Sequence, residues 1–304
     1  MSVLIIIPAR MKATRLPNKP MADIGGVSMI VQVWRRAVES QVGDVIVACD
    51  GPEIADAIVA AGGIAVITDP EHPSGSDRIW EALVKREQAM GPGTVSLSPR
   101  ERLGEGGTRA EGSDQSAAAA HAPPSPNPLP RGEGFLPRGE GALGAQVSPE
   151  KSYDIIINLQ GDVPTLEPRL LRELLAPLAD PEVDIATLAA VIERAEEHQN
   201  PSVVKAVLAL KDNEKSGRAL YFTRCAAPYG EGVRYHHIGV YAYRRSALAR
   251  FVALSPSPLE KREKLEQLRA LEAGMRIDAV VVDTVPLGVD TPEDLERARE
   301  ILRD

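Results

Sequence analysis

The first half of the chain alternates short apolar runs with segments whose apolar residues recur at helical spacing. The apolar runs, which predict strands, are VLIII at 3–7, DVIVAC at 44–49 and IAVIT at 64–68. The segments between and after them predict helices near 28–40, 53–61 and 76–90. Alternation of this kind is typical of a largely parallel sheet with helices on both faces.

The pattern stops between about 92 and 150. Pro and Gly make up 19 of these 59 residues, and LPRGEGF at 129–135 is followed at once by LPRGEGA at 136–142. A segment of this composition forms no apolar face that could pack against a core. We therefore expect a disordered low-complexity insertion. The rest of the chain has the length of one domain, so we expect a single domain over 1–304 that this insertion interrupts. A partner-binding segment is the alternative for 92–150.

The ordered pattern resumes with YDIIINLQGD at 153–162, an almost wholly apolar strand that ends in a polar turn. The elements predicted after it are a helix near 167–178, strands near 184–192, 203–210 and 235–244, a helix over 257–275 and a strand at 277–285. A last helix begins after Thr291, where Thr291 as N-cap, Pro292 as the first helical residue and Asp294 as the third form a good start signal.

Charge and cysteine content narrow the class of protein. The formal net charge is -8, with 35 basic and 43 acidic side chains, which argues against a general nucleic-acid binder. Cys49 and Cys225 are too few for a disulfide framework and fit a reducing compartment; both are expected to be buried. No stretch approaches the roughly 18 apolar residues of a membrane span. We therefore expect a cytoplasmic protein with neither nucleic-acid nor membrane partners.

Cations gather in one loop directly after the first strand. PARMKATRLPNKP at 8–20 contains Arg10, Lys12, Arg15 and Lys19, with no acid among residues 1–22. Ligands of open α/β sheets bind at the carboxyl ends of strands, so this loop predicts an anion site able to hold a triphosphate. It lacks the glycine pattern of the Walker and dinucleotide-binding loops. A solvated basic loop is the alternative.

Two aspartates follow strands in the second half of the chain, Asp162 in LQGD and Asp290 in GVDTPED. Mg²⁺ prefers one or two carboxylates plus phosphate oxygens of the substrate, so the pair together with the basic loop predicts metal-assisted phosphoryl or nucleotidyl transfer. Each aspartate alone would also suit a turn or a helix cap. His236 and His237 are adjacent on a strand and point to opposite faces, so they cannot chelate zinc together, and we expect one to face the site.

Seven segments, in this order, resemble the 3-deoxy-manno-octulosonate cytidylyltransferases, also called CMP-Kdo synthetases. They are PARMKATRLPNKPM, HPSGSDR, NLQGDVP, YFTRCAAPY, HHIGVYAYRR, SPLEKREKLEQLRALEAG and GVDTPEDL. The resemblance covers nearly the whole chain apart from 92–150. It implies a three-layer α/β/α fold of the nucleotide-diphospho-sugar transferase type, Rossmann-like, with a mixed, mostly parallel sheet. It also implies the transfer of CMP from CTP to the anomeric hydroxyl of Kdo, with release of pyrophosphate, for lipopolysaccharide biosynthesis.

The resemblance also implies roles for individual residues. Catalysis would rest on Arg10, Lys19, Asp162 and Asp290, with Asp162 and Asp290 as the Mg²⁺ ligands. The nucleotide would be bound by Arg10, Arg15, Lys19, Ser74 and Gln160. The sugar acid would be bound by Gln160, Arg224, His237, Tyr241, Glu266 and Gln267, with an arginine facing its carboxylate. A homodimer is implied as well. The chain departs from the family pattern at Ala13–Thr14 and at Val163, which cannot add a carboxylate to the metal site.

Two other functions remain open at this point. A sister cytidylyltransferase could act on a related sugar acid such as amino-Kdo or sialic acid, although HHIGVYAYRR and the 257–274 segment favour Kdo over sialic acid. A noncatalytic nucleotide-binding or interaction protein could keep the same fold. The presence of Arg10, Lys19, Asp162 and Asp290 together weighs against that second possibility, because binding alone does not need a pair of metal carboxylates.

Overall fold

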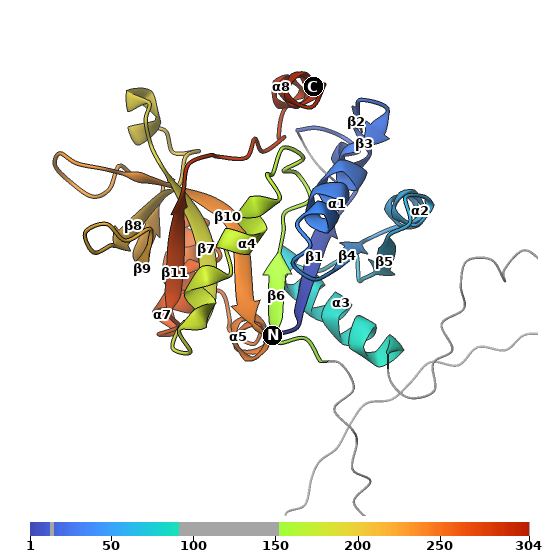
Figure 1. Cartoon of the computed structure of the whole chain (residues 1–304), viewed down its shortest axis with the longest axis horizontal. Coiled ribbons are helices and arrows are strands. Elements are labelled where there is room, and N and C mark those ends of the chain that lie inside the picture. The colour runs from blue at the N-terminus through green and yellow to red at the C-terminus, as the bar shows by residue number, and fades with distance from the viewer. Residues whose placement is uncertain (13–14, 91–151, 304) are drawn as a thin grey trace, which may run out of the picture. The chain divides into compact units, whose positions relative to one another are not determined.

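The computed structural model describes residues 1–12, 15–90 and 152–303, which belong to one compact unit (Figure 1). The insertion predicted at 92–150 and the Ala13–Thr14 departure lie outside the described residues. No helix in the described ranges is long and apolar enough to cross a membrane.

Four parallel strands form the first half of a nine-stranded sheet. In spatial order they are β5 (Ile64–Ile67), β4 (Asp44–Cys49), β1 (Val3–Ala9) and β6 (Ile155–Asn158). They lie side by side in Figure 1, with the two nearly all-apolar strands β1 and β6 adjacent. Because these strands run in the same direction, the loops that follow β1 and β6 emerge at the same edge of the sheet.

The second half of the sheet is mainly antiparallel. β10 (Tyr235–Arg244) pairs antiparallel with β6 and with β7 (Ile185–Val191), whereas β11 (Ile277–Val282) is parallel to β7. β9 (Ser216–Thr223) and β8 (Lys205–Ala209) follow, and β8 also pairs with the first residues of β10. The strands β7, β11, β9, β8 and β10 thus form a closed circuit. The predicted mixed α/β sheet is confirmed, with parallel pairing throughout the first half and, in the second half, between β7 and β11 alone among the described strands.

Helices cover both faces of the sheet and make the predicted three layers. β1 shows the division, because Val3, Ile5 and Ile7 belong to one core cluster while Leu4 and Ile6 belong to the other. The first cluster includes residues of α1 (Met29–Glu39), α2 (Pro52–Ala60) and α4 (Arg169–Glu173). The second includes residues of α3 (Gly75–Ala89), α5 (Arg245–Val252) and α7 (Leu268–Glu272).

The remaining elements are short. They are η1 (Lys19–Met21), β2 (Asp23–Ile24), β3 (Val27–Ser28), η2 (Ala176–Ala179), η3 (Ala195–His198), α6 (Pro258–Glu263) and α8 (Pro292–Ile301). α8 begins as predicted, with Thr291 and Asp294 forming a reciprocal capping box.

Several predictions differ from the structure. The single helix expected near 167–178 is a short helix, α4, followed by the separate 3-10 helix η2. The single helix expected over 257–275 is two helices, α6 and α7, because Lys264 adopts a left-handed conformation with φ 56° that ends α6. β9 was not predicted. It pairs with β8 so closely that a Cβ atom at Gly217 would lie 2.3 Å from the carbonyl oxygen of Ala209. Cys49 is buried as expected, but Cys225 is exposed.

Candidate active site

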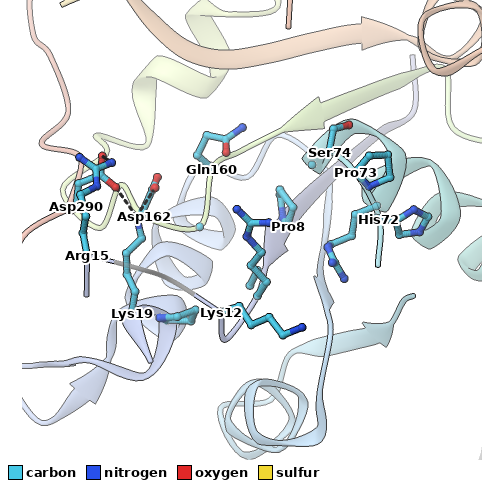
Figure 2. Close-up of a pocket in the computed structure, with 16 residues that line it drawn as sticks. Pro8, Lys12, Arg15, Lys19, His72, Pro73, Ser74, Gln160, Asp162 and Asp290 are labelled. Atoms are coloured by element: carbon cyan, nitrogen blue, oxygen red, sulfur yellow. Dashed lines mark hydrogen bonds and ion pairs between the residues drawn. The ribbon is translucent and has the colours of Figure 1, made fainter. Parts of the chain in front are cut away.

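A cavity of about 810 Å³ lies at the edge of the sheet where β1 and β6 end. Its lining includes all the residues predicted to bind the nucleotide or the metal: Arg10, Arg15, Lys19, Ser74, Gln160, Asp162 and Asp290. Figure 2 shows Lys19, Asp162 and Asp290 together at one end, with His72, Pro73 and Ser74 at the other. Segments that are far apart in the sequence therefore form a single cleft.

Backbone contacts hold the loops of this cavity close together. Gly161 packs against the end of β1 so tightly that a Cβ atom would lie 2.8 Å from the carbonyl oxygen of Pro8. On its other side, the backbone N–H of Val289 donates to the carbonyl of Asp162 over 2.9 Å. The basic loop is fixed by Asp50, whose carboxylate accepts from the backbone N–H of Met11 over 3.1 Å.

Lys19 lies between the two aspartates. Its Nζ donates to Asp162 Oδ2 over 2.7 Å and to Asp290 Oδ1 over 2.9 Å, while Arg15 Nη2 donates to Asp290 Oδ2 over 3.0 Å (Figure 2). The side chain of Lys19 is 16% exposed. Burial alone would lower the pKa of Lys19, but the charges and hydrogen bonds of the two aspartates outweigh it and raise that pKa above its ordinary value.

The same contacts act on the carboxylate of Asp290. Burial would raise the pKa of Asp290, yet the hydrogen bond and charge of Lys19 and the charge of Arg15 hold it below its ordinary value. Asp290 is therefore ionised at neutral pH. The loops thus place the carboxylate of Asp290 beside the cationic groups of Lys19 and Arg15. A carboxylate can bind a metal ion and cations can bind phosphate groups, so the cluster suits a ligand that carries both.

The donor set fits a divalent cation of the Mg²⁺ type. Two carboxylates already hold one cation, the Lys19 ammonium, between them. No cluster of three or more His, Cys, Asp or Glu suited to a metal occurs in the described ranges. A site with only two protein carboxylates matches the preference of Mg²⁺ for completing its shell with water and substrate phosphate.

Two further cationic side chains, Arg10 and Lys12, line the cavity and are available to an anionic ligand. Arg10 is exposed on the cavity wall and forms no ion pair with any described carboxylate. Lys12 also lines the cavity, but its side chain is 86% exposed and only 3.8 Å from Glu71. Ser74 caps α3, since its Oγ accepts from the backbone N–H of Asp77 over 3.2 Å. The positive end of α3 thereby faces the same space.

Three of the predicted sugar-acid residues form a cluster outside this cavity, in which His237 and Gln267 are buried and Tyr241 is partly buried. The ring of His237 lies 5.5 Å from that of Tyr241, its Nε2 is 3.1 Å from Thr187 Oγ1, and its Nδ1 is 3.5 Å from Gln267 Nε2. Burial, with a contribution from His236, lowers the pKa of His237 to about 3, so the ring is neutral at physiological pH. His236 instead lines a different cavity, as expected for neighbouring residues on a strand.

Glu266 and Arg224 have other surroundings. Glu266 accepts a hydrogen bond from Ser76 over 2.9 Å and lines a second cavity of about 480 Å³, which shares Pro73 and Ser74 with the first. The guanidinium of Arg224 donates to the backbone carbonyls of Glu263, Pro201 and Lys264. The bidentate contact to a sugar carboxylate that we considered for an arginine would require Arg224 to leave those carbonyls.

Comparison with known proteins identifies the family. The sequence matches the family described as Cytidylyltransferase over residues 4–89 and 143–277. The chain belongs to the cytidylyltransferase family. The 3-deoxy-manno-octulosonate cytidylyltransferase of Paramagnetospirillum magneticum is 48% identical, covering 99% of this chain and 97% of the relative. The protein of the same name from Bradyrhizobium sp. (strain ORS 278) is 52% identical with the same coverage.

Solved structures agree with this assignment. A CMP:2-keto-3-deoxy-manno-octonic acid synthetase complexed with CTP superposes with a TM-score of 0.72 at 32% identity, covering 99% of this chain and 98% of that one. A nucleotidyl transferase from Methanothermobacter thermautotroptrophicus, at 14% identity, 99% and 98% coverage and a TM-score of 0.52, shows the fold alone.

Two ionisable residues of this cytidylyltransferase line the cavity without having been assigned a role from the sequence. Arg78 is only 3% exposed, and its Nη1 donates to Thr68 Oγ1 over 2.6 Å. His72 contacts the carboxylate of Glu81, which also accepts from the backbone N–H of Asp69. A signal for Arg78 was present, because it lies four residues before Ala82 and thus on the apolar side of the predicted helix.

Proposed function

We propose that this cytidylyltransferase transfers CMP from CTP to the anomeric hydroxyl of 3-deoxy-manno-octulosonate (Kdo), forming CMP-Kdo for lipopolysaccharide biosynthesis. The observation that carries the proposal is the identity of about half of all positions, over 99% of the chain, with relatives of that name. The arrangement of Lys19, Asp162 and Asp290 supports it, because it supplies the charges that nucleotidyl transfer requires.

The reaction exchanges one bond for another at the α-phosphorus. The anomeric oxygen of Kdo attacks the α-phosphorus of CTP, the bond from that phosphorus to the bridging oxygen of the β-phosphate breaks, and the hydroxyl proton is released. Arg10, Arg15 and Lys19 would neutralise the triphosphate and the departing pyrophosphate. Their contribution would be positioning and electrostatic stabilisation, since the described cavity contains no nucleophilic triad.

Asp162 and Asp290 would hold Mg²⁺ together with phosphate oxygens of the nucleotide. The ion would supply charge neutralisation on the phosphates during transfer. Because Lys19 contacts both carboxylates in this structure, it would shift toward the phosphates when the ion is bound. Val163 adds no carboxylate to the site, so the ion would depend on these two aspartates.

The sugar acid would lie beside the nucleotide, on the side where the two cavities share Pro73 and Ser74. Gln160 would contact both substrates, since it lines the nucleotide cavity. His237, Tyr241, Glu266 and Gln267 would form the sugar-acid wall, with His237 neutral and acting through hydrogen bonds. Arg224 would hold this wall in place through its three carbonyl contacts.

The deciding experiment measures pyrophosphate release from the purified protein with CTP, Mg²⁺ and a panel of sugar acids. Kdo should give the highest kcat/KM, with amino-Kdo and sialic acid well below it, and omission of Mg²⁺ should stop release. No release with Kdo would overturn the proposal. Faster release with amino-Kdo would favour the sister activity, and no release with any acid would favour a noncatalytic nucleotide-binding protein.

We also propose a cytoplasmic homodimer. The two cysteines suit a reducing compartment, and the second half of the chain has several exposed large apolar side chains that a partner could cover: Val191, Leu220, Tyr229 and Val233. Light scattering of the eluting protein should give twice the mass of one chain; the mass of one chain would contradict the dimer.

A further inference from the structure

We propose that Ser76 is a positioning residue for the sugar acid. It holds one carboxylate oxygen of Glu266, so that the other oxygen, which has no hydrogen-bond partner among the described residues, can accept a hydrogen bond from a sugar hydroxyl. This inference rests on the proposed function, in which Glu266 contacts Kdo. It adds to the sugar subsite a residue of α3, the helix whose N-cap Ser74 lines the proposed nucleotide cavity.

The geometry of Ser76 singles it out. It lies in the first turn of α3, is only 1% exposed, and its Oγ donates to Glu266 Oε2 over 2.9 Å. Two residues earlier, Ser74 caps the same helix and lines both cavities. At the start of α3, Ser74 therefore lines the proposed nucleotide cavity, while Ser76 binds the carboxylate of Glu266.

The second oxygen of Glu266 is not satisfied in the same way. Oε1 is buried and has no hydrogen-bond partner among the described residues. The nearest cation, Arg269, remains 3.6 Å away because its guanidinium is engaged elsewhere. Two of its nitrogens donate to Glu260, over 2.9 and 2.7 Å, and a third donates to the carbonyl of Leu254 over 3.2 Å.

A buried carboxylate oxygen that accepts no hydrogen bond is unfavourable unless a ligand supplies one. Hydroxyl groups are donors that match such an oxygen, and a sugar acid carries several. Tyr241 is close enough to Glu266 that the carboxylate charge acts on its phenol, which connects Glu266 with the His237 cluster. With Oε2 held by Ser76 and Arg269 committed to Glu260, Oε1 is the atom left for the substrate.

The test compares Ser76→Ala with Ser76→Thr, which keeps the hydroxyl, in steady-state kinetics with Kdo and CTP. Ser76→Ala should raise KM for Kdo about tenfold, as expected for loss of one hydrogen bond to a charged group, while KM for CTP stays within about twofold of wild type. Ser76→Thr should restore KM for Kdo. Ser40→Ala is the matched control, because Ser40 is equally buried but its Oγ donates to the carbonyl of Ala37 at the end of α1.

A double-mutant cycle with Glu266→Gln separates positioning from general damage. If Ser76 acts through Glu266, Ser76→Ala should add little to the KM defect of Glu266→Gln. Equal rises in KM for Kdo and CTP, or fully additive effects, would overturn the inference while leaving the proposed function intact. If the wild type turns over no sugar acid at all, both the function and the role of Ser76 are refuted.

Discussion

The backbone N–H of Val289 donates to the carbonyl of Asp162 over 2.9 Å, and so joins the two loops that carry the acidic side chains of the candidate active site. The residue after Val289 is Asp290, so the contact lies directly beside both carboxylates. A metal ion does not have to bring these loops together, because their backbones are already joined. Such preorganisation lowers the cost of assembling a catalytic site.

The two aspartates should be indispensable to turnover but not to the fold. Asp162→Asn and Asp290→Asn should each lower kcat by at least about 100-fold, since even indirect partners of a metal often account for 10–100-fold. Pyrophosphate release and circular dichroism measure the two properties. Asp56→Asn, which changes an exposed acid on α2, is the control. Near-normal rates in both active-site variants would refute the assignment.

Replacement of Lys19 should affect metal and nucleotide in opposite directions. Lys19→Met removes the ammonium that neutralises Asp162 and Asp290, so Mn²⁺ should bind about tenfold more tightly in the absence of nucleotide, equivalent to about 1.4 kcal/mol. Affinity for CTP and turnover should both fall. Titration calorimetry with Mn²⁺ alone and with CTP distinguishes these effects. Weaker Mn²⁺ binding in this variant would contradict the proposed metal site.

Gly161 should tolerate no side chain. An added Cβ atom would lie 2.8 Å from the carbonyl oxygen of Pro8, so Gly161→Ala must push the loop of Asp162 away from the end of β1. We expect kcat to fall by roughly 100-fold, because small misplacements of reacting groups can have effects of that size. Gly239→Ala, whose added atom meets open space, should retain most activity. Equal activity of the two variants would argue against a tight approach at Gly161.

His237 should make the stability of the protein depend on pH. The pKa of His237 is about 3 in the folded protein, compared with 6.5 for an unperturbed histidine, so the unfolded state binds the extra proton first as pH falls. Its contribution to stability is therefore complete above about pH 6.5 and is lost as pH falls toward 3, by at most about 1.4 kcal/mol per pH unit.

Urea unfolding of the wild type and His237→Gln at pH 7 and pH 5 measures this contribution. The fall in the free energy of unfolding between the two pH values should be smaller in the variant. Identical falls would show that His237 is not held neutral by the fold.

Much of the fold could be predicted because the apolar runs in the sequence coincide with the strands that are buried in the structure. VLIII and YDIIIN are apolar on both sides and became the adjacent parallel strands β1 and β6. The segment at 257–275 was misjudged for a physical reason. Its apolar residues recur at helical spacing throughout, but Lys264 adopts a left-handed backbone conformation that ends α6. The spacing of apolar residues carries no information on the backbone conformation of a single polar residue. β9 was missed because a strand with Gly217 and exposed Leu220 lacks the continuous apolar run of a buried strand.

The site was predictable to the extent that it lies at strand ends. The convergence of Asp162, Asp290 and the basic loop was expected from that rule, and the structure brings them together through Lys19. The proposed sugar-acid wall rests on the resemblance alone. Its contacts, such as Ser76 with Glu266, join residues 190 positions apart, and no local pattern encodes them.

The ammonium of Lys19 between Asp162 and Asp290 also bears on how the chain reaches its folded state. Without this ammonium, the two neighbouring carboxylates would repel each other in the metal-free protein. Because Lys19 relieves this repulsion within the chain itself, we expect the protein to fold and to remain folded without the proposed Mg²⁺. Chelation should therefore silence the enzyme reversibly rather than unfold it.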